Sequence, residues 1–222
     1  LMRSKDLIHW THTEVRIDKL FPEKFGDLGC AWAPETIWDP EAKQLMVYFT
    51  IRQQAGGRTK LYYSYANEEF TTEPQLLFEY PDPKIQVLDA DICPMPGGGY
   101  FMTYDAQENP AGIRYAYSEH VNRGWKLTDG QIDTERGGCE APNTWKRIGE
   151  NKWVIMYDVY SIQPHNFGFV ETSDFKHFTP LGRFNEGKMK ATNFISPKHG
   201  SVIQITKKEA QRLINYWKNK KK

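Results

Sequence analysis

With 222 residues, the chain is long enough to bury a sizeable core, and a single domain is the simplest expectation. It carries 29 basic and 28 acidic residues, a formal net charge of +1, so we expect neither nucleic acid nor an anionic lipid surface as a partner. It has no run of about 18 apolar residues, which predicts no membrane span, and three widely spaced cysteines without a CxxC pair predict free thiols.

A phrase made of Ser or Thr, a polar turn and an aromatic residue recurs four times. In chain order it reads SKDLIHW (4–10), SYANEEF (64–70), SEHVNRGW (118–125) and TSDFKHF (172–178). Its closing aromatics, Trp10, Phe70, Trp125 and Phe178, are 60, 55 and 53 residues apart. The phrase therefore indicates an internal repeat, and from its first copy we expect the given sequence to open on folded protein rather than on a signal peptide.

A second landmark with the same period is an alternating apolar run that ends in a turn. It occurs as LMVYFT (45–50), GYFMTYD (99–105) and KWVIMYD (152–158), and its tyrosines Tyr48, Tyr104 and Tyr157 are 56 and 53 residues apart. Two independent landmarks thus support one repeat length.

Each repeat contains several short β-rich runs separated by turns such as GGR (56–58) and PGGG (96–99). This pattern predicts one four-stranded sheet per repeat, which is typical of β-propeller blades. Trp10 would close a blade that begins upstream of Leu1, so three complete repeats are expected, with most of another after them. We predict an all-β fold, an N-terminally incomplete β-propeller forming a single domain over residues 1–222.

The C-terminus is the one segment with a helical pattern. Thr206 and Glu209 form a T-x-x-E capping box, and lysines gather at the end of the segment. One face carries the apolar residues Ala210, Leu213, Ile214 and Trp217. We predict a helix over residues 206–221 that packs on the outside of the propeller.

Three tripeptides precede the tyrosine landmarks by nearly the same distance. They are WAP (32–34), DAD (89–91) and EAP (140–142). Because the first strand of every propeller blade runs along the central axis, Trp32, Asp89 and Glu140 are predicted to converge in one funnel. Two carboxyl groups beside a tryptophan suit glycoside hydrolysis, in which one acid protonates the leaving oxygen and another carboxylate activates water or attacks carbon.

Other residues near these tripeptides have competing interpretations. Asp91 shares the face of Asp89 on an extended strand and is its main alternative, while Glu35 is a candidate to line the funnel. The six histidines show no HExxH spacing, and PGGGY is expected to be a hairpin turn rather than a phosphate loop. Chance alignment of acidic residues is the alternative to a shared site.

These residues resemble glycoside hydrolase family 43, five-bladed propellers that cleave arabinofuranosyl or xylosyl linkages with inversion. The segments SKDLIHW, WAPETIWDP, LDADICP, CEAPNTWKRIGENKWVIMYD and SPKHGSVIQIT each look like a family motif and follow the family's order. The resemblance implies five blades and a substrate containing arabinose or xylose, such as a plant-type polysaccharide. It also implies secretion or a periplasmic location.

The resemblance further implies roles for individual residues. Glu140 would be the general acid, and Asp89 would tune its pKa and orient the sugar. Trp32 would help form the sugar pocket, and from their positions beside it Asp91 and Glu35 are further candidates to contact substrate. His199, in the phrase KHGSV, matches a family histidine that in some members holds water or a calcium ion, although a satisfied buried histidine is an equal alternative. No cofactor is required for the reaction.

The chain departs from the family pattern in one respect. The family's general base is an Asp in the first blade, upstream of the phrase that SKDLIHW resembles, so the base is expected upstream of Leu1. A non-catalytic propeller that binds carbohydrate is the alternative function. A protein-interaction propeller of the WD type is disfavoured, because the signatures of that class are not found.

Overall fold

The computed structural model describes residues 1–54, 56–66, 72–189 and 195–220. Within these ranges, twelve strands form three antiparallel four-stranded sheets. The first sheet contains β3 (Leu28–Asp39), β4 (Gln44–Gln53), β5 (Lys60–Tyr65) and β6 (Gln75–Phe78). The second contains β7 (Val87–Pro94), β8 (Tyr100–Ala106), β9 (Gly112–Ser118) and β10 (Lys126–Gln131), and the third contains β11 (Glu140–Lys146), β12 (Trp153–Val159), β13 (Asn166–Thr172) and β14 (Thr179–Arg183).

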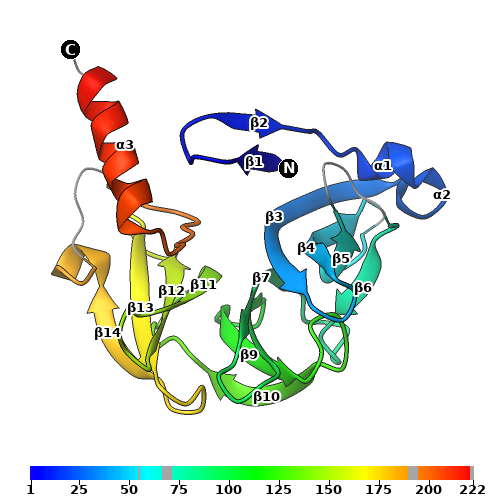
Figure 1. Ribbon diagram of the computed structural model, residues 1–222. Coiled ribbons are helices and arrows are strands. Elements are labelled where there is room, and N and C mark those ends of the chain that lie inside the picture. The colour runs from blue at the N-terminus through cyan, green and yellow to red at the C-terminus, as the bar shows by residue number, and fades with distance from the viewer. Residues whose placement is uncertain (55, 67–71, 190–194, 221–222) are drawn as a thin grey trace.

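The three sheets follow one another around an arc, as Figure 1 shows. In each sheet the strands are hydrogen-bonded in sequence order, and the first strand forms one edge. The strand β7 contacts both β3 and β11, so the first strands of successive sheets meet on the inside of the arc. The all-β class and the prediction of four strands per repeat are confirmed, and the arrangement is propeller-like.

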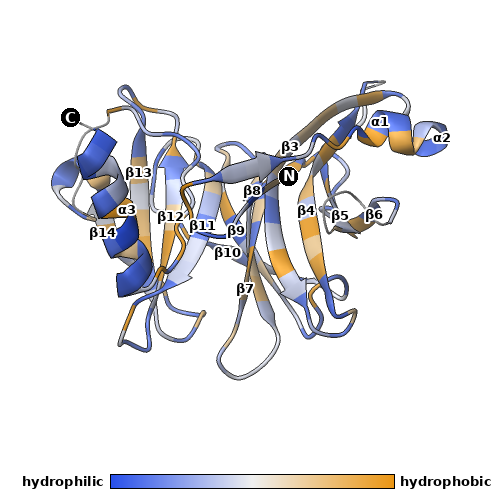
Figure 2. Ribbon diagram, turned by 45° about the horizontal axis from the view of Figure 1, so that its top comes forward, coloured by the Kyte–Doolittle hydropathy of each residue, from blue (hydrophilic) through white to orange (hydrophobic). Residues whose placement is uncertain are grey.

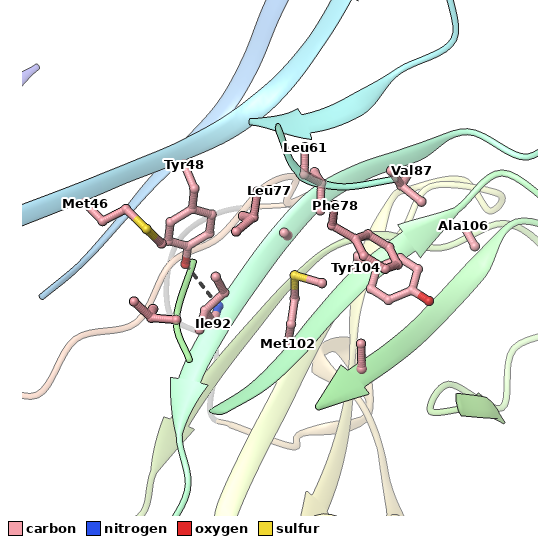
Figure 3. Close-up of a cluster of buried hydrophobic side chains, with 13 residues drawn as sticks. Met46, Tyr48, Leu61, Leu77, Phe78, Val87, Ile92, Met102, Tyr104 and Ala106 are labelled. Atoms are coloured by element: carbon pink, nitrogen blue, oxygen red, sulfur yellow. Dashed lines mark hydrogen bonds between the residues drawn. The ribbon is translucent and has the colours of Figure 1, made fainter. Parts of the chain in front are cut away.

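Apolar side chains fill the space between successive sheets. Between the first two sheets, Met46 and Tyr48 pack with Met102 and Tyr104, all 2% exposed or less (Figure 3). The backbone N–H of Ile92 donates a hydrogen bond of 3.0 Å to the Tyr48 hydroxyl, which ties the two sheets together. The alternating runs therefore supply the core, as their pattern predicted.

The second and third sheets enclose a similar cluster. It contains Phe101 from β8, Trp153 and Tyr157 from β12, and Phe175 from the turn between β13 and β14. Every residue of β12 is buried, because this strand is covered on both faces. Figure 2 shows hydrophobic residues along β4, β12 and β13, whereas the C-terminal helix is mainly hydrophilic.

The N-terminal hairpin, β1 (Met2–Ser4) and β2 (Trp10–His12), repeats the local structure of the β13–β14 hairpin. In its turn, Asp6 accepts a hydrogen bond from the His9 backbone (2.8 Å) and lies 2.8 Å from His9 Nδ1. Asp174 makes the same two contacts with His177, at 2.9 and 2.7 Å. The repeated phrase thus encodes one turn, although its second copy ends at Phe70, outside the described residues.

The remaining elements are helical. Two four-residue helices, α1 (Ile17–Leu20) and α2 (Pro22–Phe25), were not predicted, because one turn of helix leaves no periodic pattern; they bury Ile17 and Phe25 against the first sheet. A 3-10 turn, η1, spans Phe184–Glu186. No helix of the described chain has the length and apolar character needed to span a bilayer.

The C-terminal helix α3 (Lys207–Lys220) begins with the expected capping box, in which Thr206 and Glu209 exchange hydrogen bonds of 2.7 and 3.2 Å. Its predicted apolar face is only partly covered, because Ala210 and Leu213 are half-buried whereas Ile214 and Trp217 are 47% and 58% exposed. The Tyr216 ring instead lies 6.1 Å from the His9 ring of the N-terminal hairpin. The three cysteines are buried free thiols, as predicted.

Candidate active site

A pocket of about 180 Å³ lies where the first strands of the three sheets meet the segment 199–201. We call it the axial pocket. Each first strand contributes two or three consecutive residues. The lining residues are Ala33, Pro34, Glu35, Asp89, Ala90, Ala141, Pro142, His199, Gly200 and Ser201.

Each of the three first strands carries a β-bulge at the axial pocket. Within the bulges, Ala33, Asp89 and Ala141 have positive φ angles of 46°, 51° and 48°. Residues other than glycine rarely adopt this left-handed conformation, and bulges are over-represented beside active sites, where they redirect side chains. The pocket is therefore built by a repeated backbone distortion.

The bulges correct the predicted alignment of Asp89. In each sheet, the residue before the one with positive φ pairs with a residue toward the end of the second strand. These pairs are Trp32 with Thr50, Leu88 with Asp105 and Glu140 with Asp158. Trp32 and Glu140 are therefore equivalent, as expected, but their counterpart in the second sheet is Leu88. Asp89 is equivalent to Ala33 and Ala141 instead, and it reaches the axial pocket from the left-handed position.

Glu140 is held by two basic side chains from one segment. Its Oε1 atom lies 2.9 Å from the Lys198 ammonium and 3.1 Å from His199 Nε2. The hydrogen bond from His199, and then that from Lys198, lowers the pKa of Glu140 to about 2 although burial acts in the opposite direction. The same contact raises the pKa of His199. Glu140 is therefore a carboxylate at neutral pH in the absence of a sugar.

Asp89 lies in a different electrostatic environment. It is 7% exposed, and burial raises its pKa, with the charge of His199 opposing and that of Glu140 adding to the effect. Its backbone N–H donates a 3.1 Å hydrogen bond to Thr50 Oγ1 in the first sheet. Asp89, Glu140 and His199 each place a polar atom within 4.8 Å of the others, so the predicted acidic pair is brought together.

These three side chains fit a calcium ion poorly. Calcium takes six to eight oxygen ligands, whereas this set offers two carboxylates and an imidazole. The Lys198 ammonium already supplies a positive charge to Glu140, so a divalent cation would have to displace it. The side chains are better suited to holding a proton or a sugar hydroxyl.

Three charged residues of this site were missed by sequence reasoning. Asp105 and Asp158 are fully buried at the ends of the second strands, each with an Oδ1 atom that lacks a protein hydrogen bond. Burial raises the pKa of Asp105 to about 8, and Asp158 accepts a 3.3 Å bond from the His199 backbone. The signal was present, because both close the repeated YD phrase, and Lys198 precedes His199 directly.

Asp91 and Glu35 have separate positions. Asp91 is 7% exposed and does not line the axial pocket, since its carboxylate accepts hydrogen bonds from Thr144 N (2.7 Å) and Asn143 Nδ2 (3.3 Å) on β11. Burial, followed by the charge of Glu35, raises its pKa to about 7. Asp91 thus links two sheets, in place of the substrate contact expected for it. Glu35 does line the axial pocket, and burial raises the pKa of its carboxyl group.

Trp32 lies beside the axial pocket rather than in its lining. Its ring is 42% exposed, and the Arg52 guanidinium lies over it at 5.2 Å. An exposed indole face next to the residues Ala33 and Pro34 of the pocket remains available for stacking on a sugar ring.

Comparisons with known proteins agree on the fold. A thermostable family-43 glycoside hydrolase matches with a TM-score of 0.67 and 17% identity, over 91% of this chain and 70% of that one. The endo-arabinase from Bacteroides thetaiotaomicron matches with a TM-score of 0.51 and 13% identity, over 68% of this chain and 56% of that one. The β-fructofuranosidase from Schwanniomyces occidentalis matches with a TM-score of 0.60 and 13% identity, over 71% of this chain and 35% of that one. This chain therefore spans between about a third and 70% of the length of these proteins.

No curated protein matches the sequence. The family model described as "Probable glycosyl hydrolase domain", related to glycoside hydrolase family 43, matches residues 1–211. The chain belongs to this family 43-related group of glycosyl hydrolase domains.

Proposed function

We propose that this chain carries the acid half of an inverting glycosidase site that cleaves arabinofuranosyl or xylosyl linkages of plant-type polysaccharides. The observation that carries the proposal is the convergence of Asp89, Glu140 and His199 within 4.8 Å of one another, with Asp89 and His199 lining the axial pocket and Glu140 directly before the lining residue Ala141. Glu140 donates the proton to the leaving oxygen, and Asp89 tunes its pKa and orients the sugar. The reaction needs no cofactor, and chelator should leave both activity and unfolding temperature unchanged.

The spacing of the carboxylates supports this division of roles. In an inverting enzyme the acid and the base stand about 6.5–9.5 Å apart, because a water molecule lies between the base and the sugar. Asp89 is within 4.8 Å of Glu140, which is too near for that base but suitable for tuning an acid. We place the base upstream of Leu1, as the family resemblance implies, in a five-bladed propeller that is secreted or periplasmic.

Proton donation requires a change at Glu140 when the sugar binds. A carboxylate with a pKa of about 2 carries almost no proton near neutral pH. A sugar that displaces the Lys198 ammonium and excludes water would remove one of the two cationic hydrogen-bond donors to Glu140 and leave the carboxyl groups of Asp89 and Asp158 nearby. Both effects raise the pKa of Glu140, so substrate binding itself prepares the acid.

A carbohydrate-binding propeller without hydrolysis is the second candidate. The observation that favours it is the double contact of Glu140 with Lys198 and His199, which stabilises the ionised form that cannot act as an acid. A binding protein would keep this arrangement when a sugar is present. An enzyme would have to release at least one of these two contacts of Glu140 when the sugar binds.

Turnover and binding, measured together, separate the two candidates. The chain, with any coding sequence that precedes Leu1, is assayed with aryl arabinofuranosides and xylosides and with arabino- and xylo-oligosaccharides, and the anomer released first is identified by NMR. Glu140→Gln should lower turnover at least about 100-fold, the usual contribution of a general acid. Glu150→Gln, at an exposed turn, is the matched control. Unchanged turnover in Glu140→Gln contradicts the acid role, and binding without product supports the second candidate.

A further inference from the structure

A second and larger hollow, of about 540 Å³, lies on the first sheet near the ends of β4 and β6. We call it the basic groove. Among the residues described, its lining includes three cationic side chains, Arg52, Arg58 and Lys84, and no acidic one. Three side-chain amides, those of Gln53, Gln54 and Gln86, complete its polar surface. In a chain whose formal net charge is only +1, this is a local concentration of positive charge.

One of the three cations is already neutralised. The Arg58 guanidinium donates to Glu79 at 2.7 Å and to the carbonyl oxygens of Tyr80 (2.8 Å) and Asp82 (2.9 Å). Arg58 therefore holds the segment 79–85 in place, and this segment carries Lys84.

The other two cations are exposed and have no carboxylate partner in the described part of the chain. The Arg52 guanidinium lies over the Trp32 ring, and an arginine in this position keeps its N–H edge available for a second group. The carboxylate of Asp82 accepts the backbone N–H of Lys84 at 2.9 Å and makes no salt bridge with its ammonium. Arg52 and Lys84 are thus two charges without counterions beside hydrogen-bonding amides.

The basic groove and the axial pocket are lined by residues of the same two neighbouring strands. On β3, Gly29 lines the groove and Ala33 lines the pocket, four residues or on the order of 13 Å further along an extended strand. At the start of β7, Gln86 lines the groove and Asp89 lines the pocket, three residues or about 10 Å away. The exposed Trp32 ring lies on the β3 route, so one oligosaccharide could occupy the pocket, the indole face and the groove together.

We infer that the basic groove binds a carboxylate-bearing sugar, a uronic acid unit of the polysaccharide, a short distance from the bond at the axial pocket. The inference rests on the proposed function for its polymer and names the substrate class more closely. A guanidinium fork and an ammonium recognise a carboxylate by charge-assisted hydrogen bonds, and the amides suit the ring hydroxyls. Neutral sugars alone would leave both cations unpaired.

Calorimetry with matched oligosaccharides tests the inference without depending on turnover. The ligands are a neutral xylo-oligosaccharide, the same oligosaccharide with one glucuronic acid branch, and a sulfated oligosaccharide of similar length. We expect the uronate ligand to bind about tenfold more tightly than the neutral one, and the preference to shrink in high salt. Lys84→Glu should abolish the preference, and Lys84→Gln should reduce it.

Lys43→Gln is the matched control, because Lys43 is exposed in the turn between β3 and β4, at the opposite end of the same sheet. It should keep the full preference. Equal binding of neutral and uronate ligands, or a preference for the sulfated ligand alone, would overturn the inference. Since binding is measured and not cleavage, a protein that binds uronate but hydrolyses nothing would contradict the proposed function and leave this inference standing.

Discussion

Replacing Lys198 with glutamine tests how the charge of the candidate acid is controlled. In the folded chain the pKa of Glu140 lies at about 2, compared with an ordinary value of 4.5. His199 makes the larger contribution to this difference, and Lys198, at 2.9 Å, makes the next. The Lys198 side chain is 42% exposed, so solvent weakens its effect, and its loss should raise the pKa of Glu140 by about one unit.

The free-energy equivalent of this change is about 1.4 kcal/mol, and the protonated fraction of Glu140 above pH 4 would rise about tenfold. NMR titration of carboxyl-labelled glutamate follows the group directly, with the Glu140→Gln spectrum identifying its signal. In an active protein, kcat/KM should rise most for substrates with poor leaving groups, because these depend most on proton donation.

Lys207→Gln, an exposed change at the start of α3, should leave the Glu140 titration unchanged. An identical Glu140 pKa in the Lys198 variant and the wild type would show that His199 and the local backbone fix the charge without Lys198. The account of acid activation by displacement of Lys198 would then be wrong.

Three further predictions concern stability. Asp105→Asn should raise the unfolding temperature above pH 7 and flatten its pH dependence. The folded pKa of Asp105 is about 8 and the unfolded one 3.8, so between these pH values the native state holds a proton that the unfolded state has lost. Over this window the free energy of unfolding of the wild type falls by up to about 1.4 kcal/mol per pH unit. Asp91→Ala should cost about 1–3 kcal/mol in urea unfolding, because it leaves the part-buried Thr144 N–H and the buried Asn143 amide of the next sheet without their acceptor; recovery in Asp91→Asn would show that the hydrogen bond matters more than the charge. Gly168→Ala should cost a similar amount, since the new methyl group would meet the buried Tyr157 ring at 2.3 Å, whereas Gly97→Ala, with open space, should be neutral.

The repeat and the strands could be predicted from the sequence because both depend on local patterns. Alternating apolar runs such as KWVIMYD become fully buried strands, and the phrase around Asp174 forms the same turn as the phrase around Asp6. Asp39 likewise forms a local turn between β3 and β4, accepting hydrogen bonds from the backbone N–H groups of Glu41 and Ala42. In each case the residues that determine the structure lie within about ten positions of one another.

The register of the axial pocket could not be predicted in this way. All three first strands carry the bulge at the same place, so the error came from matching DAD with EAP on their shared alanine, which put Asp89 one position from its structural equivalent, Ala141. The contact between Lys198 and Glu140 joins residues 58 positions apart and depends on how the segment 198–202 crosses the third sheet. The helix α3 has an amphipathic pattern, but such a pattern does not specify which surface covers it, and Trp217 stays exposed.

The charges at the axial pocket separate the two predicted carboxyl groups in the direction opposite to their proposed roles. Burial raises the pKa of Asp89, while His199 and Lys198 lower that of Glu140, so the proton in the free protein is held more readily by Asp89. Environments that push two pKa values apart decide which group holds the proton in many active sites, and here the free protein favours the proton on Asp89 rather than on the proposed acid, Glu140. For Glu140 to act as the acid, this order must be exchanged when the sugar binds, and the change that we propose for it is displacement of the Lys198 ammonium, whose side chain is 42% exposed.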